Sequence, residues 1–265
     1  MTPGFFRYVI LISVITAGGI GFVPAPGRAF DQAHECPMPE RFYEFEPPLP
    51  KTAKALATGR NVVITVIGGS STMGRAAGAT ALSWPARLGS VLSDRFPAAQ
   101  IKVVNRAVAR QTAKQVLERL DRDILPVKPN LVIWETGTME AVRGADVDAF
   151  RETVGTGIDE LRAAGVEVVL MNMQFSRETD AMIYFEPYLT AMRQVADAND
   201  VPLFRRHGIM RYWAESGLLD LRVREDEKRR ELAVKLYDCI GRAMADFVTH
   251  GNGDAAAKAK SGTGR

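Results

Sequence analysis

Histidine and cysteine are scarce in this chain of 265 residues, which has three histidines and two cysteines. His34, His207 and His250 are dispersed, and Cys36 and Cys239 lie near opposite ends of the sequence. Protein metal sites need several such ligands together, so we expect no metal site. The chain also lacks the lysine of a phosphate-binding loop and the glycine spacing of a dinucleotide fingerprint, so we expect no cofactor.

A strong excess of one charge is absent too, because 34 Lys and Arg residues face 31 Asp and Glu residues. Such a balance provides no polybasic field, and we therefore expect no nucleic-acid partner. The fraction of hydrophobic residues, 46%, and the length are ordinary for a globular protein with one main domain.

One strongly apolar stretch, residues 8–23, follows a short segment that carries Arg7. With the small-x-small site Gly27-Arg28-Ala29 after it, the pattern predicts a signal peptide over residues 1–29. The alternative is an uncleaved anchor, which would be the only membrane contact. In both cases we expect a periplasmic or secreted domain. An oxidising compartment would allow a bridge between Cys36 and Cys239, and free thiols are the alternative.

Local composition divides the remaining chain into three parts. Five prolines between positions 37 and 50 predict an extended arm over residues 30–58. Strands and helices then alternate through a domain at 59–250, which indicates a parallel α/β sheet. The Gly/Ala/Lys-rich tail at 251–265 is expected to be disordered. The expected strands are 62–67, 101–105, 130–134, 166–172 and 201–204, and the expected helices are 83–95, 112–123, 146–164, 181–198 and 226–248.

The first strand is the most informative element. Its continuous β-branched run has no polar face, so it reads as a central strand covered on both sides. The run stops at Gly68-Gly69, a tight turn that directs Ser70 outwards at the strand's carboxyl end, where ligands of such sheets bind. Ser70, Ser71 and Thr72 are also common turn and helix-cap residues without any chemistry.

Four segments in order resemble the blocks of the SGNH hydrolases, or GDSL-like esterases. They are Gly68–Gly74, Asn105–Ala113, Trp134–Ala141 and Asp220–Val223, with Gly69 in place of the family's aspartate. The resemblance covers roughly residues 60–248. It implies a flavodoxin-like three-layer sandwich with a five-stranded parallel sheet.

The resemblance also implies a serine nucleophile, a histidine base oriented by an aspartate, and an oxyanion hole of amide donors. Ser70 and Asp220 keep the family's serine and aspartate. The family histidine falls on Val223, its oxyanion asparagine on Met139 and its oxyanion glycine on Arg110. Valine cannot accept a proton and methionine has no amide to donate. The remaining expected lining of the pocket is Gly69, Ser71 and Gly137.

Three other residues are candidates for the missing base. His207 follows the fifth strand, and the alternative for it is a capping or surface role. Glu135 and Glu140 flank the third block and could act as bases if burial raised their pKa. For Glu140 the alternative is a first-turn acid favoured by a helix dipole. Arg106 and Arg110 could favour an anionic ligand, or could form surface ion pairs.

Three functions are consistent with these residues. The first is an exported, catalytically impaired relative that binds acylated envelope glycans or a small ester. The second is an active esterase, deacetylase or acyltransferase that uses Ser70 with a displaced base. The third is a structural scaffold, which a large exposed apolar patch away from the strand ends would indicate.

Overall fold

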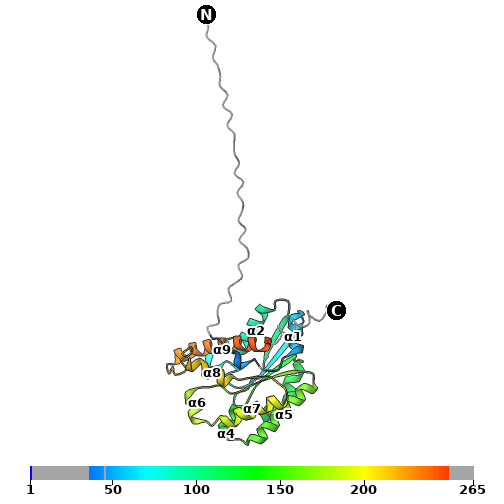
Figure 1. Ribbon diagram of the computed structural model, residues 1–265, viewed down its shortest axis with the longest axis vertical. Helices are drawn as coiled ribbons and strands as arrows, with labels where there is room; N and C mark the ends of the chain where they lie inside the picture. Colours follow the sequence, from blue (N-terminus) through cyan, green and yellow to red (C-terminus); the bar gives the residue numbers. More distant parts are fainter. Residues whose placement is uncertain (2–35, 45, 251–265) are drawn as a thin grey trace. The chain divides into compact units, whose positions relative to one another are not determined.

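A five-stranded parallel sheet organises the part of the chain that the computed structural model describes, residues 1, 36–44 and 46–250 (Figure 1). The strand order is β2-β1-β3-β4-β5, so β1 lies between β2 and β3. This order is the flavodoxin-like one, and the expected fold class is confirmed. The strands are β1 Asn61–Ile67, β2 Gln100–Asn105, β3 Leu131–Glu135, β4 Glu167–Met171 and β5 Leu203–Phe204.

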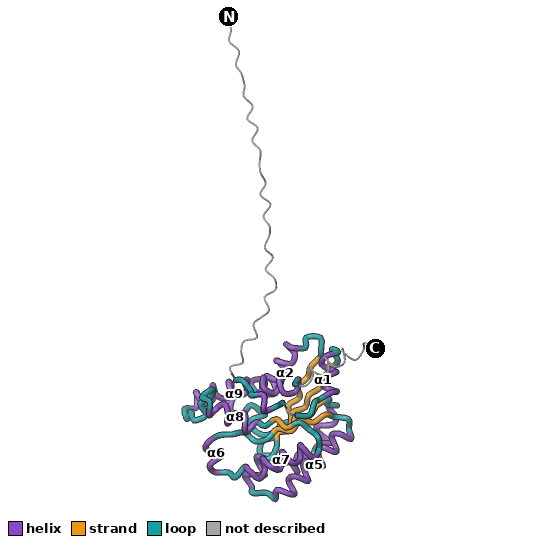
Figure 2. The backbone as a smooth tube through the Cα atoms, viewed as in Figure 1, coloured by secondary structure: helices purple, strands orange, loops and turns teal. Residues whose placement is uncertain are grey.

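Helices cover both faces of the sheet and give three layers (Figures 1 and 2). One face packs against α1, α2, α8 and α9, and the other against α3, α5 and α7. The helices are α1 Pro50–Ala57, α2 Trp84–Arg95, α3 Ala113–Leu117, α4 Thr138–Arg143, α5 Val147–Ala163, α6 Arg177–Met182, α7 Glu186–Ala198, α8 Arg206–Glu215 and α9 Asp226–Thr249.

The central strands have apolar side chains on both faces, as their sequences predict. In β3, Leu131 and Ile133 belong to the α2/α9 core, whereas Val132 and Trp134 belong to the α5/α7 core. All four side chains are fully buried. Successive side chains of a strand point to opposite faces of the sheet, so each central strand contributes to two hydrophobic cores and has no solvent-exposed face.

Three sequence-based expectations about helices were wrong. The expected helix 112–123 ends at Leu117, and a π-helical turn and a 3-10 turn that contains Pro126 follow it. The expected helix 181–198 is two helices, α6 and α7, and Pro187 lies in the first turn of α7, where proline is favourable. Helix α8 was not expected, and no side chain caps its first turn.

The arm over residues 30–58 is not extended throughout, which corrects the prediction for its described residues. A 3-10 turn spans Glu40–Phe42, and α1 begins at Pro50. The carboxylate of Glu167 accepts hydrogen bonds from the amides of Lys51 (2.8 Å) and Thr52 (2.7 Å), so it caps the first turn of α1. A carboxylate 115 residues away supplied this cap, and local sequence could not show it.

A disulfide between Cys36 and Cys239 ties the start of the described domain to α9, with a Cα–Cα distance of 5.5 Å. The sequence had left this pairing open. The amide of Leu203 in β5 donates to the Glu46 carboxylate at 2.7 Å, which is a second attachment of the same segment. Residues 36–57 are thus integrated into the domain and do not form a separate arm.

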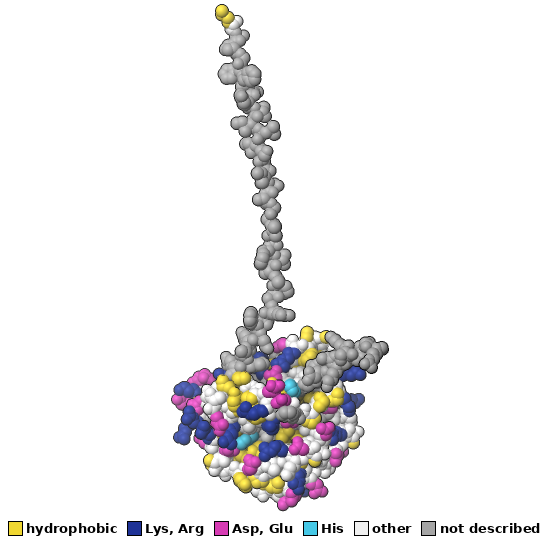
Figure 3. All heavy atoms as spheres, in the orientation of Figure 1, with side chains coloured by type: hydrophobic (Ala, Val, Ile, Leu, Met, Phe, Trp, Pro, Cys, Tyr) yellow, Lys and Arg dark blue, Asp and Glu magenta, His cyan; other side chains and the backbone are white. Residues whose placement is uncertain are grey.

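The predicted signal peptide and tail lie outside the described residues. Within the described ranges, none of the helices combines the length and the apolar character that crossing a bilayer requires. Basic and acidic side chains are interspersed on the face of the domain that Figure 3 presents.

Candidate active site

A cavity of about 210 Å³ opens at the carboxyl ends of the strands, beside the point where β1 lies between β2 and β3. Doubly wound sheets bind ligands at such a crossover point. Loops after β1, β2, β3 and β4 all contribute to this cavity, which we call the Ser70 pocket. Its lining is Gly69, Ser70, Ser71, Arg110, Gln111, Glu135, Thr136, Gly137, Thr138, Met139 and Gln174.

Ser70 is exposed at the tip of the turn after β1. Its carbonyl accepts from the amide of Arg75 at 3.2 Å. Among the described residues, no side chain forms a hydrogen bond with its hydroxyl group. The turn thus presents a serine to the pocket, as predicted, but no described residue activates it.

The buried carboxylate of Glu135, at the end of β3, forms several hydrogen bonds with this turn. Its oxygens accept from the amide of Gly69 (3.3 Å) and from the hydroxyls of Ser71 (3.2 Å) and Thr72. A Cβ atom at Gly68 would lie 2.5 Å from the carboxylate, so only glycine fits there. The carboxylate stabilises the turn and fixes the direction in which Ser70 points.

Arg206, the first residue of α8, neutralises that carboxylate. Its Nη1 donates to Glu135 at 2.9 Å, and its side chain is 0% exposed. Its Nη2 donates to Gln174 Oε1 at 3.0 Å. The carboxylate is thus occupied by the turn and by Arg206 and makes no hydrogen bond with the Ser70 hydroxyl, so the sequence-based hypothesis that Glu135 is a base is not supported.

Glu140 is also committed to a structural role. Its carboxylate accepts from the amide of Ala113 at 2.5 Å, at the start of α3. Burial raises the pKa of this carboxyl group, and hydrogen bonds from the amides of Ala113, Glu140 and Gly137 act in the opposite direction. The residue therefore caps helix starts, and it does not line the Ser70 pocket.

The raised pKa of Glu140 leads to a pH prediction. Between the ordinary value of 4.5 and the raised pKa, the folded protein binds more protons than the unfolded chain, so wild-type stability falls as pH rises through that window. Glu140→Gln removes this titration. We expect the stability of E140Q relative to wild type to increase as pH rises, measured by urea unfolding from pH 4 to 7.5. A difference that is constant across this range would contradict the assignment.

His207 is buried in a different arrangement. Its Nε2 lies 2.7 Å from Asp180 Oδ1, and its ring packs edge-on against Phe175. Its amide donates to Asn172 at 2.9 Å, which fixes the start of α8. His207 does not line the Ser70 pocket. The structure thus pairs it with an aspartate and gives it no contact with Ser70.

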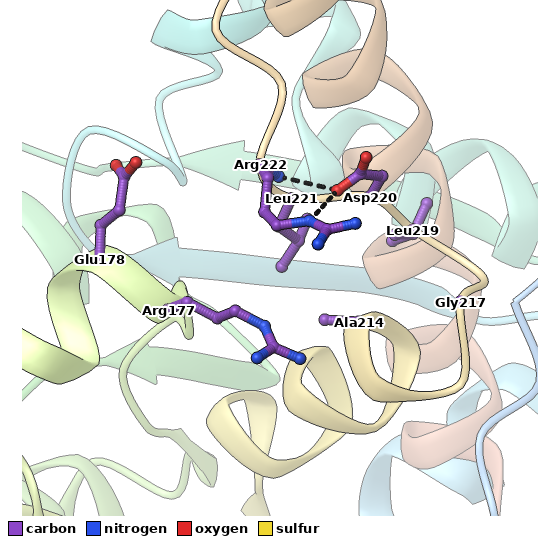
Figure 4. Close-up of a pocket in the computed structure, with 8 residues that line it drawn as sticks. All are labelled: Arg177, Glu178, Ala214, Gly217, Leu219, Asp220, Leu221 and Arg222. Carbon is purple, nitrogen blue, oxygen red and sulfur yellow. Dashed lines mark hydrogen bonds and ion pairs between the residues drawn. The ribbon is translucent and has the colours of Figure 1, made fainter.

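Asp220 lies away from the Ser70 pocket, contrary to expectation. It lines a second cavity, between α6, the end of α8 and the loop before α9 (Figure 4). Its carboxylate accepts from Arg222 Nε at 2.9 Å, and this exposed ion pair lowers the pKa of Asp220. Val223 lines neither cavity. The fourth block thus lies in an exposed loop, and neither of its two candidate residues lines the Ser70 pocket.

The structure therefore brings together seven of the residues that the sequence suggested for the site. These are Gly69, Ser70, Ser71, Arg110, Glu135, Gly137 and Met139. Five residues of the site were not predicted: Gln111, Thr136 and Thr138, which lie inside the four blocks, and Gln174 and Arg206. A signal existed for Gln174, because it is a polar residue just beyond the carboxyl end of β4.

The chain matches the profile of the Non-GDSL lipase-like family over residues 35–254. It is 26% identical over 140 residues to thioesterase 1/protease 1/lysophospholipase L1 of Escherichia coli (strain K12), which covers 53% of this chain and 64% of that protein. The chain thus spans less than two thirds of the curated relative's length.

Solved structures show the same fold at low identity. A two-domain esterase active on acetylated mannans, co-crystallised with mannopentaose, aligns with a TM-score of 0.61 at 16% identity, over 78% of this chain and 57% of that one. TesA aligns with a TM-score of 0.51 at 21% identity, over 67% and 97%. The family match, the sheet order and the serine turn agree: this chain belongs to the Non-GDSL lipase-like family of the SGNH hydrolase superfamily.

Proposed function

We propose that this protein is an exported, catalytically impaired member of its superfamily that binds acylated glycans in the Ser70 pocket without hydrolysing them. The observation that carries the proposal is the state of the Ser70 hydroxyl, which has no hydrogen-bonded base among the described residues. Glu135 is paired with Arg206, Glu140 caps α3, and His207 is paired with Asp180.

The known effects of losing catalytic groups on turnover support the proposal that catalysis is impaired. Loss of a catalytic histidine costs on the order of 10⁶ in turnover in a serine protease, and loss of one oxyanion donor costs about 10² to 10³. Here Val223 stands at the family's histidine position and Met139 at its asparagine position. Arg110 has φ +59°, so this position keeps the left-handed backbone that a glycine would adopt, but it adds a side chain to the pocket.

Two observations support a glycan ligand. The pocket lining is rich in hydroxyl and amide side chains, which suit the hydroxyl groups of a sugar: Ser70, Ser71, Gln111, Thr136, Thr138 and Gln174. A structurally similar esterase acts on acetylated mannans. Export is supported by the predicted signal peptide and by the Cys36–Cys239 disulfide, because such bonds persist in oxidising compartments.

We expect the purified protein to release p-nitrophenol from p-nitrophenyl acetate at the same rate as its Ser70→Ala variant, within twofold. The reason is that the Ser70 hydroxyl, without a base to take its proton, is no stronger a nucleophile than the surrounding water. The initial rate above buffer, measured at pH 6 to 9, checks this. Turnover that Ser70→Ala abolishes would overturn the impairment.

An active ester hydrolase remains a second candidate because of one observation, the His207–Asp180 pair at 2.7 Å. A histidine oriented by an aspartate is the arrangement that activates a serine in hydrolases. This candidate requires α6 and α8 to carry His207 to Ser70 when substrate binds. It predicts that a fluorophosphonate labels Ser70 and that His207→Ala abolishes labelling, whereas impairment predicts no labelling of either protein.

A further inference from the structure

The Ser70 pocket contains one cationic side chain, Arg110, among its lining residues. The side chain of Arg110 makes no hydrogen bond or ion pair with any described residue, although its carbonyl oxygen is held. The only carboxylate of the pocket, Glu135, is already neutralised by the fully buried Arg206. The described pocket therefore carries one positive charge without an internal counter-ion, and an anionic group would complete it.

The backbone around Arg110 is fixed in place. Its φ of +59° is unfavourable for a residue with a Cβ atom, and such conformations persist only where neighbours enforce them. Arg143 Nη2 donates to the carbonyl oxygen of Arg110 at 3.2 Å. The next residue, Gln111, accepts from Nε of the buried Arg119 at 3.0 Å. These hydrogen bonds hold the loop in a conformation in which Arg110 lines the pocket.

Further donors line the same pocket. Arginine can only donate, so the Gln174 atom that faces Arg206 Nη2 is the amide oxygen, and the amide NH₂ of Gln174 remains as a donor. The hydroxyl of Thr138 is buried and has no partner among the described residues. A guanidinium, an amide NH₂ and a free hydroxyl together match the acceptor oxygens of a carboxylate.

We propose that the Ser70 pocket recognises the carboxylate of an acidic sugar, a uronate, and that Arg110 is the residue that selects it. The proposal deepens the proposed function, because it uses the same pocket and adds a substrate class. The pocket favours a sugar acid over a fatty acid, since six of its eleven lining residues have hydroxyl or amide side chains and Met139 is its one large apolar side chain.

The test compares trigalacturonate with its neutral counterpart, galactotriose, and with octanoate, by isothermal titration at 50 mM and 300 mM NaCl. We expect trigalacturonate to bind at least tenfold more tightly than either of the other probes, and more weakly at the higher salt. Arg110→Gly should weaken trigalacturonate binding by about 10- to 100-fold, because a charge-assisted bidentate contact is lost. The affinity of Arg110→Lys for trigalacturonate should lie between those of wild type and Arg110→Gly, since lysine keeps the charge but cannot make the bidentate contact of a guanidinium.

Arg106→Ala is the matched control, because Arg106 lies in the same loop but does not line the pocket. It should bind trigalacturonate like wild type. Arg110→Gly should have a melting temperature no lower than wild type, since glycine accepts the positive φ, so misfolding would not explain lost binding. Unchanged binding in Arg110→Gly, no trigalacturonate binding at 10 mM, or equal binding of galactotriose or octanoate would each overturn the proposal. Ser70-dependent ester turnover would overturn the proposed function and leave the role of Arg110 standing.

Discussion

Replacing Arg206 by methionine is expected to lower the free energy of unfolding by about 3–5 kcal/mol, because the change leaves the carboxylate of Glu135 buried without its counter-charge. The Arg206 side chain is 0% exposed and that of Glu135 is 6% exposed, so water compensates poorly for the lost partner. Urea unfolding at pH 7, followed by circular dichroism, measures the effect. The turn that presents Ser70 should loosen as well, since Glu135 holds it.

A double-mutant cycle separates this effect from lost packing. In Glu135→Gln/Arg206→Met no charge is left unpaired, and the neutral amide still offers an oxygen to the turn. We therefore expect the double variant to be more stable than the sum of the two single losses predicts, by at least 1 kcal/mol. As a control, Arg193→Ala breaks the solvent-exposed ion pair with Glu186 and should lower the free energy of unfolding by about 1 kcal/mol or less. Strict additivity in the cycle would refute the proposed coupling.

Removing the disulfide should have the second large effect. Cys36 and Cys239 are 203 residues apart in sequence, so the bridge closes most of the chain into one loop in the unfolded state. Cys36→Ser/Cys239→Ser is expected to lose about 2–5 kcal/mol of unfolding free energy, and the loss should include the anchorage of residues 36–57. Unfolding of both proteins with and without dithiothreitol measures it.

The reductant provides the control for this prediction. Dithiothreitol should bring wild type down to the stability of the double variant and leave the double variant unchanged. If the oxidised wild type and the double variant unfold at the same urea concentration, the bridge contributes nothing to stability.

The sequence predicted the sheet well because the strands are continuous apolar runs whose chemistry is local. The segment Val62–Ile67 has no polar face to expose to solvent, so its sequence alone predicts that β1 is a central strand. The glycines that follow it favour a tight turn, which predicts that Ser70 points outwards. The alternation of strands with helices predicted that the strands run parallel. Missed elements lacked local signals: α8 begins with Arg206 and His207, both buried by distant partners.

The polar contacts of the site could not be predicted in the same way. Glu135 ends an otherwise apolar strand, which indicates a buried carboxylate in need of a partner. Its partner, Arg206, is 71 residues away and is one of 34 basic residues. The prediction that Asp220 belongs to the site was wrong for a related reason. The motif before the last helix identifies residue types, but the course of the exposed loop that carries them depends on contacts that the local sequence does not show.

The bond between Glu46 and the amide of Leu203 has a consequence for the behaviour of the protein at high concentration. β5 is one of the two edge strands of the sheet. The amide of Leu203 faces away from β4, because the amides of Leu170 in β4 and of Asn172 just after it pair with the carbonyls of Pro202 and Phe204. A free outer amide is where a strand of another molecule would begin to add. Because Glu46 occupies it, and because β5 has only two residues, this margin of the sheet is poorly suited to self-association.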